Sequence, residues 1–292
     1  MKNVYLVIFV AVILLGVFFS YQKREIKILF VGDMFFDRYI RQVGESKGED
    51  FIFYCISNFL KDSSLVVGNL EGPITDSPSV SQGTVVGSPE NYVFTFPPST
   101  AKLLARNNIK IVNLGNNHIN NFGGWGVSST KKYLAEAGIK YFGQPREARS
   151  DSEDVKWGNI SFISYNEFGG DSKEKVAQKI KEEKESGQMV FVYAHWGDEY
   201  AEVPLRVKNV AKLFAKSGAD FIIGSHPHVI LPSQKVSDTI VYYSLGNFIF
   251  DQYWNKEVST GLVLELNIKG KEINVIEHKV SLNRDGRTCL VN

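Results

Sequence analysis

The sequence predicts a layered α/β domain that contains a second, partly antiparallel sheet. Up to about residue 225, apolar runs typical of buried strands alternate with amphipathic segments typical of helices. From residue 239 onward, four further apolar runs follow one another with no helical segment between them. With 292 residues, 43% of them apolar and 22% charged, the chain has room for one large domain, or two small ones, plus an appendage.

The first three quarters of the chain supply the alternating elements. The run 28–31 is continuously apolar, as expected for a strand covered on both faces. Helices are indicated where apolar residues recur at helical spacing, and two of them end at Gly138 and Gly218. The expected strands are 25–31, 64–67, 92–96, 109–114, 160–165, 189–194 and 221–223, and the expected helices are 51–60, one starting at 99, 125–137, 173–185 and 205–217.

The last part of the chain predicts strands at 239–243, 248–250, 262–268 and 273–280, with a Gly-containing hairpin turn at 269–272. Residues 72–92 are rich in Gly, Pro, Ser and Thr and show no periodicity. Loops of that length within compact domains are usually functional or mobile, so we expect a long surface loop there.

Residues 4–19 form an uncharged apolar run with Lys2 before it and Lys23 and Arg24 after it. A membrane-spanning helix needs about 20 residues, and flanking polar residues could complete the span. Because no small-x-small cleavage site or lipid-accepting cysteine follows, we expect an uncleaved signal anchor at 1–24 and a folded domain at 25–292. Positive charge is similar on both sides, which leaves the orientation open.

The charge and cysteine content lead to two expectations, one about a nucleic-acid partner and one about a disulfide. The formal charge is +1, from 33 basic and 32 acidic residues, and no basic stripe is interleaved with aromatics. A nucleic-acid partner is therefore not expected. Cys55 and Cys289 could form a disulfide, but sequence alone does not show proximity. We expect two buried or unpaired thiols instead.

Five of the expected strands end in side chains that bind metals. Because the ends of such strands meet at one edge of an open α/β sheet, where ligands bind, we expect these groups to lie together. Carboxylates, amides and imidazoles suit Zn, Mn or Fe. The residues concerned are Asp33, Glu71, Asn117, His118, His195, His226 and His228.

Each of these segments alone also has an ordinary structural explanation. Asp33 could cap a helix, Glu71 could be a solvated loop acid, and His195 could be a hydrogen-bonded core residue. The pair His226 and His228 is the most specific element, because side chains two residues apart in an extended backbone point to the same side.

Two neighbouring segments also have both an ordinary structural explanation and a functional one. Asn117 could simply form a turn, although a turn does not explain the histidine that follows it. Asp198 and Glu199 follow His195 closely, and we expect them to orient its second ring nitrogen, as metal-bound histidine usually requires.

Taken together, six ordered motifs resemble the bacterial capsule-synthesis CapA family, which is linked to poly-γ-glutamate production. The resemblance covers roughly residues 26–255, and its last motif, SLGNFIFD, is especially diagnostic. The motifs are Gly32-Asp33, Asn69 to Pro73, Asn116 to His118, His195 to Tyr200, Gly224 to Val229 and Ser244 to Asp251.

That family is in turn similar to calcineurin-like metallophosphoesterases, which carry two metal ions on a four-layer α/β/β/α fold. The resemblance implies that Glu71 bridges the ions and that His118 is the general acid. Two ions roughly 3.5–4 Å apart polarise a phosphoryl group and generate a hydroxide nucleophile. The implied ligands are Asp33, Glu71, Asn117, His195, His226 and His228, with Asn69, Glu199 and Asn247 in support.

The sequence departs from the wider phosphoesterase pattern at two positions. Phe35 stands where those enzymes usually have histidine, so one of the two metal sites loses a ligand. Asn121 stands where the family tends to have aspartate, and an amide stabilises an imidazolium less well than a carboxylate does. We therefore expect one divalent ion, or two with the second weakly held.

The leading hypothesis is a single-pass, membrane-anchored extracytoplasmic protein of capsule or exopolymer biosynthesis or export, with a metal-dependent hydrolase site. Its expected partners are polymer-synthase subunits and an anionic polymer or phosphoester substrate. One alternative is a metal-dependent phosphoesterase unrelated to capsule. The other is a catalytically silent scaffold or binding subunit of a polymer synthase, which Phe35 favours and the intact histidine set disfavours.

Overall fold

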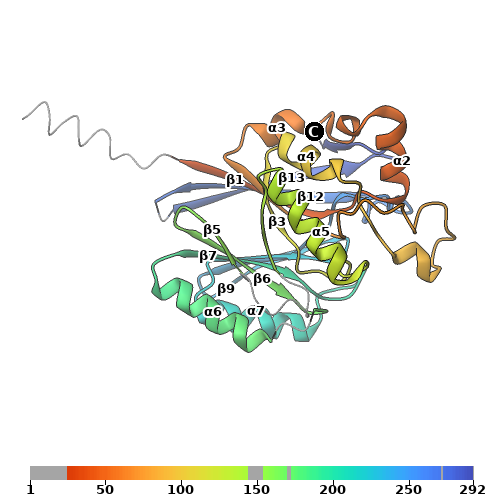
Figure 1. The fold of residues 1–292 in the computed structure, drawn as a ribbon. Coiled ribbons are helices and arrows are strands. Elements are labelled where there is room, and N and C mark those ends of the chain that lie inside the picture. Colours follow the sequence, from red (N-terminus) through yellow and green to blue (C-terminus); the bar gives the residue numbers. More distant parts are fainter. Residues whose placement is uncertain (1–24, 144–153, 170–171, 271, 292) are drawn as a thin grey trace, which may run out of the picture.

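Two β-sheets lie face to face, with helices on the outer face of each (Figure 1). The computed structural model describes residues 25–143, 154–169, 172–270 and 272–291. The six α-helices of this part are α2 (Arg38–Lys47), α3 (Ser57–Lys61), α4 (Ser99–Arg106), α5 (Gly123–Glu136), α6 (Lys173–Glu185) and α7 (Leu205–Ser217). Two short 3₁₀ helices, η1 (Glu49–Phe53) and η2 (Pro89–Tyr92), complete the helical segments.

The first sheet has eight strands in the order β14-β13-β12-β1-β2-β3-β4, with β11 pairing to β1 off this path. Its central strands β1, β2 and β3 are parallel, whereas β12, β13 and β14 are antiparallel to their neighbours. The strands are β1 (Ile26–Met34), β2 (Leu65–Leu70), β3 (Ile109–Asn113), β4 (Lys140–Phe142), β11 (Asn247–Ile249), β12 (Thr260–Lys269), β13 (Glu272–Leu282) and β14 (Thr288–Leu290).

The second sheet has six strands in the order β5-β6-β7-β8-β10-β9. Strands β6, β7, β8 and β10 are parallel, and the two edge strands run antiparallel to their neighbours. The strands are β5 (Asp154–Trp157), β6 (Ile160–Asn166), β7 (Met189–His195), β8 (Phe221–Ser225), β9 (Ile230–Val236) and β10 (Thr239–Leu245).

Three apolar layers hold the elements together, and β1 shows how they arise. Side chains alternate between the faces of a strand, so Leu29 and Val31 enter the layer under α2 to α5, while Ile28 and Phe30 enter the layer between the sheets. A third layer joins the second sheet to α6 and α7. A strand covered on both faces needs a continuous apolar run, which is the pattern that the sequence shows.

The predicted α/β class is confirmed, and α6 and α7 have the predicted bounds. Two predicted elements were wrong: 51–60 is divided between η1 and α3, and 92–96 makes only an isolated bridge from Phe96 to Ile74. The edge strand β9 was missed because it contains Pro232 and its side chains are largely exposed, which leaves no apolar period to detect.

Cys55 and Cys289 form a disulfide, with their Cα atoms 5.0 Å apart. The prediction of unpaired thiols was therefore wrong. The two residues are 234 positions apart in sequence, and they approach each other only because the last strand, β14, lies beside η1.

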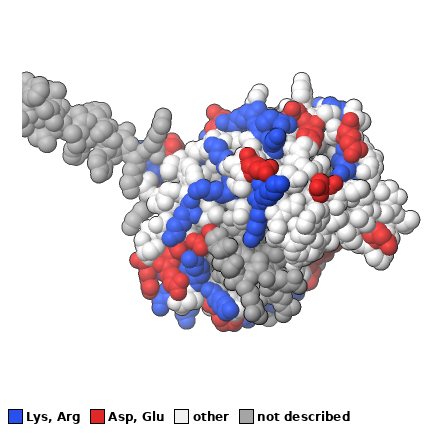
Figure 2. Space-filling view, viewed as in Figure 1, with Lys and Arg blue, Asp and Glu red and all other residues white. Residues whose placement is uncertain are grey.

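The predicted anchor at 1–24 lies outside the described residues. Among the helices of the described ranges, none has the length and apolar character needed to cross a membrane. On the face drawn in Figure 2, basic and acidic side chains are interspersed, in keeping with the formal charge of +1.

Candidate metal centre

The two sheets bring their polar strand ends to one place. Asp33 lies near the end of β1 and Glu71 just after β2, while His195 ends β7 and the pair His226 and His228 follows β8. Ligand atoms of Asp33, Glu71 and His228 lie within 4.8 Å of one another, and so do those of Glu71, His195 and His226. Glu71 is thus shared by two adjacent groups of three possible ligands, which we call the Asp33 triad and the His195 triad.

Two glycines allow the strands to come this close. A Cβ atom on Gly32, just before Asp33, would lie 1.9 Å from the carbonyl oxygen of Gly246. A Cβ atom on Gly224, two residues before His226, would lie 2.0 Å from the carbonyl oxygen of Tyr243. Neither position has room for a side chain, so close packing of the backbone explains why glycine stands in these two motifs.

The backbone around the histidine pair is strained and left-handed, so the expectation of an extended backbone at His226 and His228 was wrong. His226 has a φ of 93° and His228 a φ of 58°, a left-handed region that costs of order 1–3 kcal/mol for residues other than glycine. The backbone N–H of His226 donates to Asp33 Oδ2 at 3.0 Å, which joins this segment to β1. Strain of this kind is retained where the surrounding structure positions functional side chains.

A buried amide network supports the carboxylates. Asn69 Nδ2 donates to Asp33 Oδ1 at 2.8 Å and lies 3.4 Å from Glu71 Oε2. Asn113 and Asn116 each donate to Asn69 Oδ1 at 3.2 Å, which fixes the orientation of that amide. Asn113 was missed from the sequence, where it appears only as the polar last residue of an apolar strand.

Polar partners surround both ring nitrogens of His195. Nδ1 lies 3.0 Å from Ser225 Oγ and 3.4 Å from Asn69 Nδ2, which can only donate. Nε2 lies 2.9 Å from Asn117 Oδ1, which can only accept. The imidazole nitrogen and the amide oxygen are both of a kind that binds divalent metals.

The expected orientation of His195 by Asp198 and Glu199 was wrong. Ser225 performs that role, while Asp198 forms an ion pair with Arg206 at 2.6 Å. Glu199 instead lies beside His226 and His228, with one carboxylate oxygen within 4.8 Å of a ring nitrogen of each.

Asn247 orients His228. Its Nδ2 group donates to the carbonyl oxygen of Val258 at 2.9 Å and to Gln252 Oε1 at 3.0 Å. The amide oxygen therefore accepts from His228 Nδ1 at 2.9 Å, which leaves Nε2 facing Glu71 Oε1 at 3.5 Å. Gln252 was not predicted from the sequence, because its role depends only on its hydrogen bond with Asn247.

His118 is held by Asn121 and packs against Phe94. Its Nδ1 is 3.2 Å from Asn121 Oδ1, which also accepts from the backbone N–H of Phe94 at 2.9 Å. Its ring centroid is 4.1 Å from that of Phe94. Burial lowers the pKa of His118 to about 4, so the ring is neutral near pH 7.

Burial also disfavours charge on the proposed ligands themselves. It raises the pKa of Asp33 to about 6, and it raises the pKa of Glu71 well above its usual value, with further repulsion from Asp33. Burial lowers the pKa of His226 to about 4 and that of His228 to about 3. The imidazoles are therefore neutral, and the carboxyl groups ionise less readily than usual. A bound cation would stabilise the ionised form of these carboxyl groups.

Two buried atoms of the candidate centre are left without hydrogen bonds. Among the described residues, Glu71 Oε1 and His226 Nδ1 have no hydrogen-bond partner. A buried polar atom of this kind costs about 1–3 kcal/mol unless something satisfies it. The donor set of carboxylate, amide and imidazole fits Mn, Fe or Zn, so these residues could hold such an ion.

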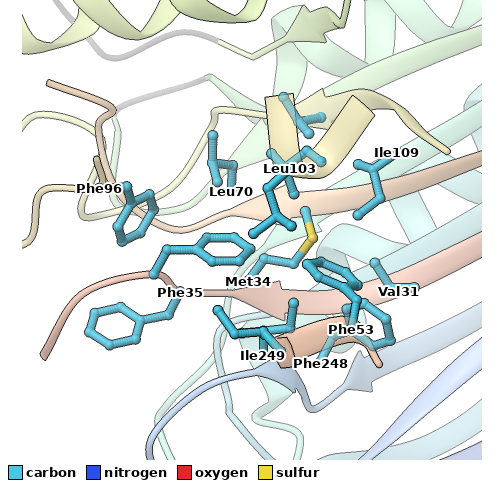
Figure 3. Packing of buried hydrophobic residues seen from close by; sticks show 14 of the residues in the cluster. Val31, Met34, Phe35, Phe53, Leu70, Phe96, Leu103, Ile109, Phe248 and Ile249 are labelled. Atoms are coloured by element: carbon cyan, nitrogen blue, oxygen red, sulfur yellow. The ribbon is translucent and has the colours of Figure 1, made fainter. Parts of the chain in front are cut away.

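Phe35 does not face this centre as a ligand. Its ring is fully buried, and its centroid lies 4.6 Å from that of Phe250, 4.8 Å from that of Phe94 and 5.7 Å from that of Phe96. Figure 3 shows Phe35 and Phe96 within this apolar cluster. The guanidinium carbon of Arg38 lies 4.5 Å from the ring centroid. An aromatic cluster therefore surrounds the side chain at the position where the wider pattern has a histidine.

The comparisons with known proteins agree with the predicted resemblance. Residues 27–252 match the family described as "Bacterial capsule synthesis protein PGA_cap". The "PGA biosynthesis protein CapA" of Bacillus subtilis (strain 168) is 30% identical over 266 residues, which cover 84% of this chain and 68% of that protein. The "Capsule biosynthesis protein CapA" of Bacillus anthracis is 28% identical over 268 residues, which cover 83% and 64%. The chain spans about two thirds of the length of each relative. It belongs to the bacterial capsule synthesis protein family.

Proposed function

We propose that this chain is a membrane-anchored, extracytoplasmic protein of capsule or exopolymer biosynthesis or export that carries a divalent metal centre with hydrolase activity. The names of its relatives support the capsule role. The apolar run at 4–19 supports the anchor. The disulfide between Cys55 and Cys289 supports an oxidising compartment, since such bonds are rare in the cytosol.

The observation that carries the hydrolase proposal is the sharing of Glu71 by two triads of buried ligands. Asp33, Glu71 and His228 would hold one ion. Glu71, His195 and His226 would hold another, with Asn117 as a further ligand. A bound divalent ion supplies Lewis acidity and a lowered pKa for water. The helix, sheet, sheet and helix layers resemble the metallophosphoesterase sandwich that the sequence led us to expect.

His118 is the group we assign to proton transfer. Its Nδ1 is engaged by Asn121, so Nε2 is the atom that gains or releases a proton. The neutral ring would take a proton from the attacking water at Nε2 and pass it to the oxygen or nitrogen of the leaving group as the substrate bond breaks. The substrate class that fits this chemistry is a phosphoester or an anionic polymer, and synthase subunits are the expected partners.

Metal analysis of the full-length protein, purified in detergent and reconstituted with Mn, Fe or Zn, tests the proposal. We expect bound metal in the wild type and its loss in Glu71→Ala and His226→Ala. His278→Ala is the matched control, because His278 pairs with Glu265 and belongs to neither triad. A wild type without metal, or triad variants that retain it, would reject the centre.

Hydrolysis needs a separate measurement. The metal-loaded protein is expected to cleave a generic phosphodiester or a poly-γ-glutamate chain, and both triad variants are expected to be inactive. A metal-loaded wild type that cleaves neither would instead support the silent scaffold, which is the hypothesis that Phe35 favours.

A further inference from the structure

We infer that Glu199 is an additional metal ligand, which joins the Asp33 triad beside His228 and compensates for the ligand that Phe35 does not provide. This inference rests on the proposed metal centre. It goes beyond it, because it assigns a ligand role to a carboxylate that was expected only to orient His195.

The two triads differ in the number of possible metal ligands around them. The His195 triad contains two imidazoles, and Asn117 Oδ1 lies 2.9 Å from one of them. The Asp33 triad contains only one imidazole, that of His228. A fourth protein ligand is therefore lacking at the Asp33 triad, and Phe35 is held within its aromatic cluster.

Glu199 lies beside His228 of the Asp33 triad and beside His226 of the His195 triad. One of its carboxylate oxygens is within 4.8 Å of ring nitrogens of both His228 and His226. Its negative charge also contributes to the raised pKa values of Asp33 and Glu71. Nδ1 of the neighbouring His226 is buried and has no hydrogen-bond partner among the described residues, which is an independent indication that a ligand is missing at His226.

The local backbone directs Glu199, rather than Asp198, toward the centre. Arg206 donates two hydrogen bonds to Asp198, of 2.6 and 2.9 Å, and the same guanidinium group also donates to Glu167. The next residue, Tyr200, has a φ of 58° and donates its backbone N–H to the carbonyl oxygen of Pro227 at 2.9 Å. This bond ties the residue after Glu199 to the segment that carries both histidines.

Calorimetric titration of the metal-free, full-length protein with Mn²⁺ tests the assignment. We expect Glu199→Gln to weaken Mn²⁺ binding at least tenfold, or to remove one bound ion, since losing even a residue that only supports a ligand costs about 10–100-fold. Glu202→Gln is the matched control from the same loop and should bind as the wild type does. Thermal melting of the metal-free variants should show equal stability, because Glu199 is exposed.

The outcomes separate this inference from the proposal beneath it. If Glu199→Gln and wild type bind Mn²⁺ alike, the assignment is overturned while the metal centre stands. If Glu202→Gln weakens binding as much as Glu199→Gln does, the effect is general surface charge and the assignment is again overturned. A wild type that binds no Mn²⁺ overturns both.

Discussion

Lowering the pH from 7 to 5 should weaken divalent metal binding by about tenfold through Asp33 alone. Metal ligands must be deprotonated to bind. With a pKa of about 6, caused mainly by burial, Asp33 is about one tenth protonated at pH 7 and about nine tenths protonated at pH 5. Protons therefore compete with the metal over this range, at a cost of about 1.4 kcal/mol.

The pKa values of the other proposed ligands show how far each of them contributes to the fall in metal affinity between pH 7 and pH 5. The pKa of Glu71 is also raised, so it strengthens the fall in affinity toward acid pH. His226 and His228 have pKa values of about 4 and about 3, so they remain neutral at pH 5 and do not compete. An unperturbed carboxyl group, with a pKa near 4, would give almost no change between pH 7 and pH 5.

Competition titration with Mn²⁺ and a fluorescent chelator at pH 7, 6 and 5 measures this dependence, with far-UV circular dichroism to confirm that the fold persists. His278→Ala should follow the wild-type curve, since His278 lies outside both triads. A pH-independent affinity would refute the raised carboxylate pKa values. A steep loss centred near pH 6.5 would instead show that the histidines titrate normally.

Three further predictions concern the fold and its location. Cys289→Ser should lower the free energy of unfolding in urea by about 4–5 kcal/mol, because the bond closes a loop of 234 residues; an unchanged midpoint would contradict this. Gly32→Ala should cost more than about 3 kcal/mol because its Cβ would strike Gly246. In contrast, Gly44→Ala in α2 should be neutral or stabilising by up to about 1 kcal/mol, and equal effects of the two would refute the packing argument. Deleting residues 1–24 should release the protein from membranes in a fractionation assay, and continued retention would count against the anchor.

The central strands and the site residues could be predicted because both leave local marks in the sequence. A strand covered on both faces needs an unbroken apolar run, as 28–31 and 189–194 show. Polar residues that interrupt such runs at their ends, such as Asp33 and His195, then stand out. The structure brings them together because β1 and β7 lie in facing sheets that end at the same place.

Other features could not be predicted because they arise from contacts distant in sequence. Asn247 was named as a supporting residue only through the family resemblance; it lies at the centre because β11 pairs in parallel with β1, opposite Asp33, and the local sequence does not show that pairing. Ser225 lies 3.0 Å from His195 Nδ1 because β7 and β8 pair in parallel with these two residues opposite each other. The sequence showed that Phe35 cannot bind a metal, but only the structure shows the aromatic cluster around it.

Anomalous diffraction from crystals grown with Mn²⁺ tests the central claim most directly, because it locates the ion instead of counting it. We predict an anomalous peak beside Glu71, bounded by Asp33 and His228 on one side or by His195 and His226 on the other. A saturated crystal without a peak at Glu71, or with peaks only at surface carboxylates, would contradict the assignment of this cluster as a metal centre.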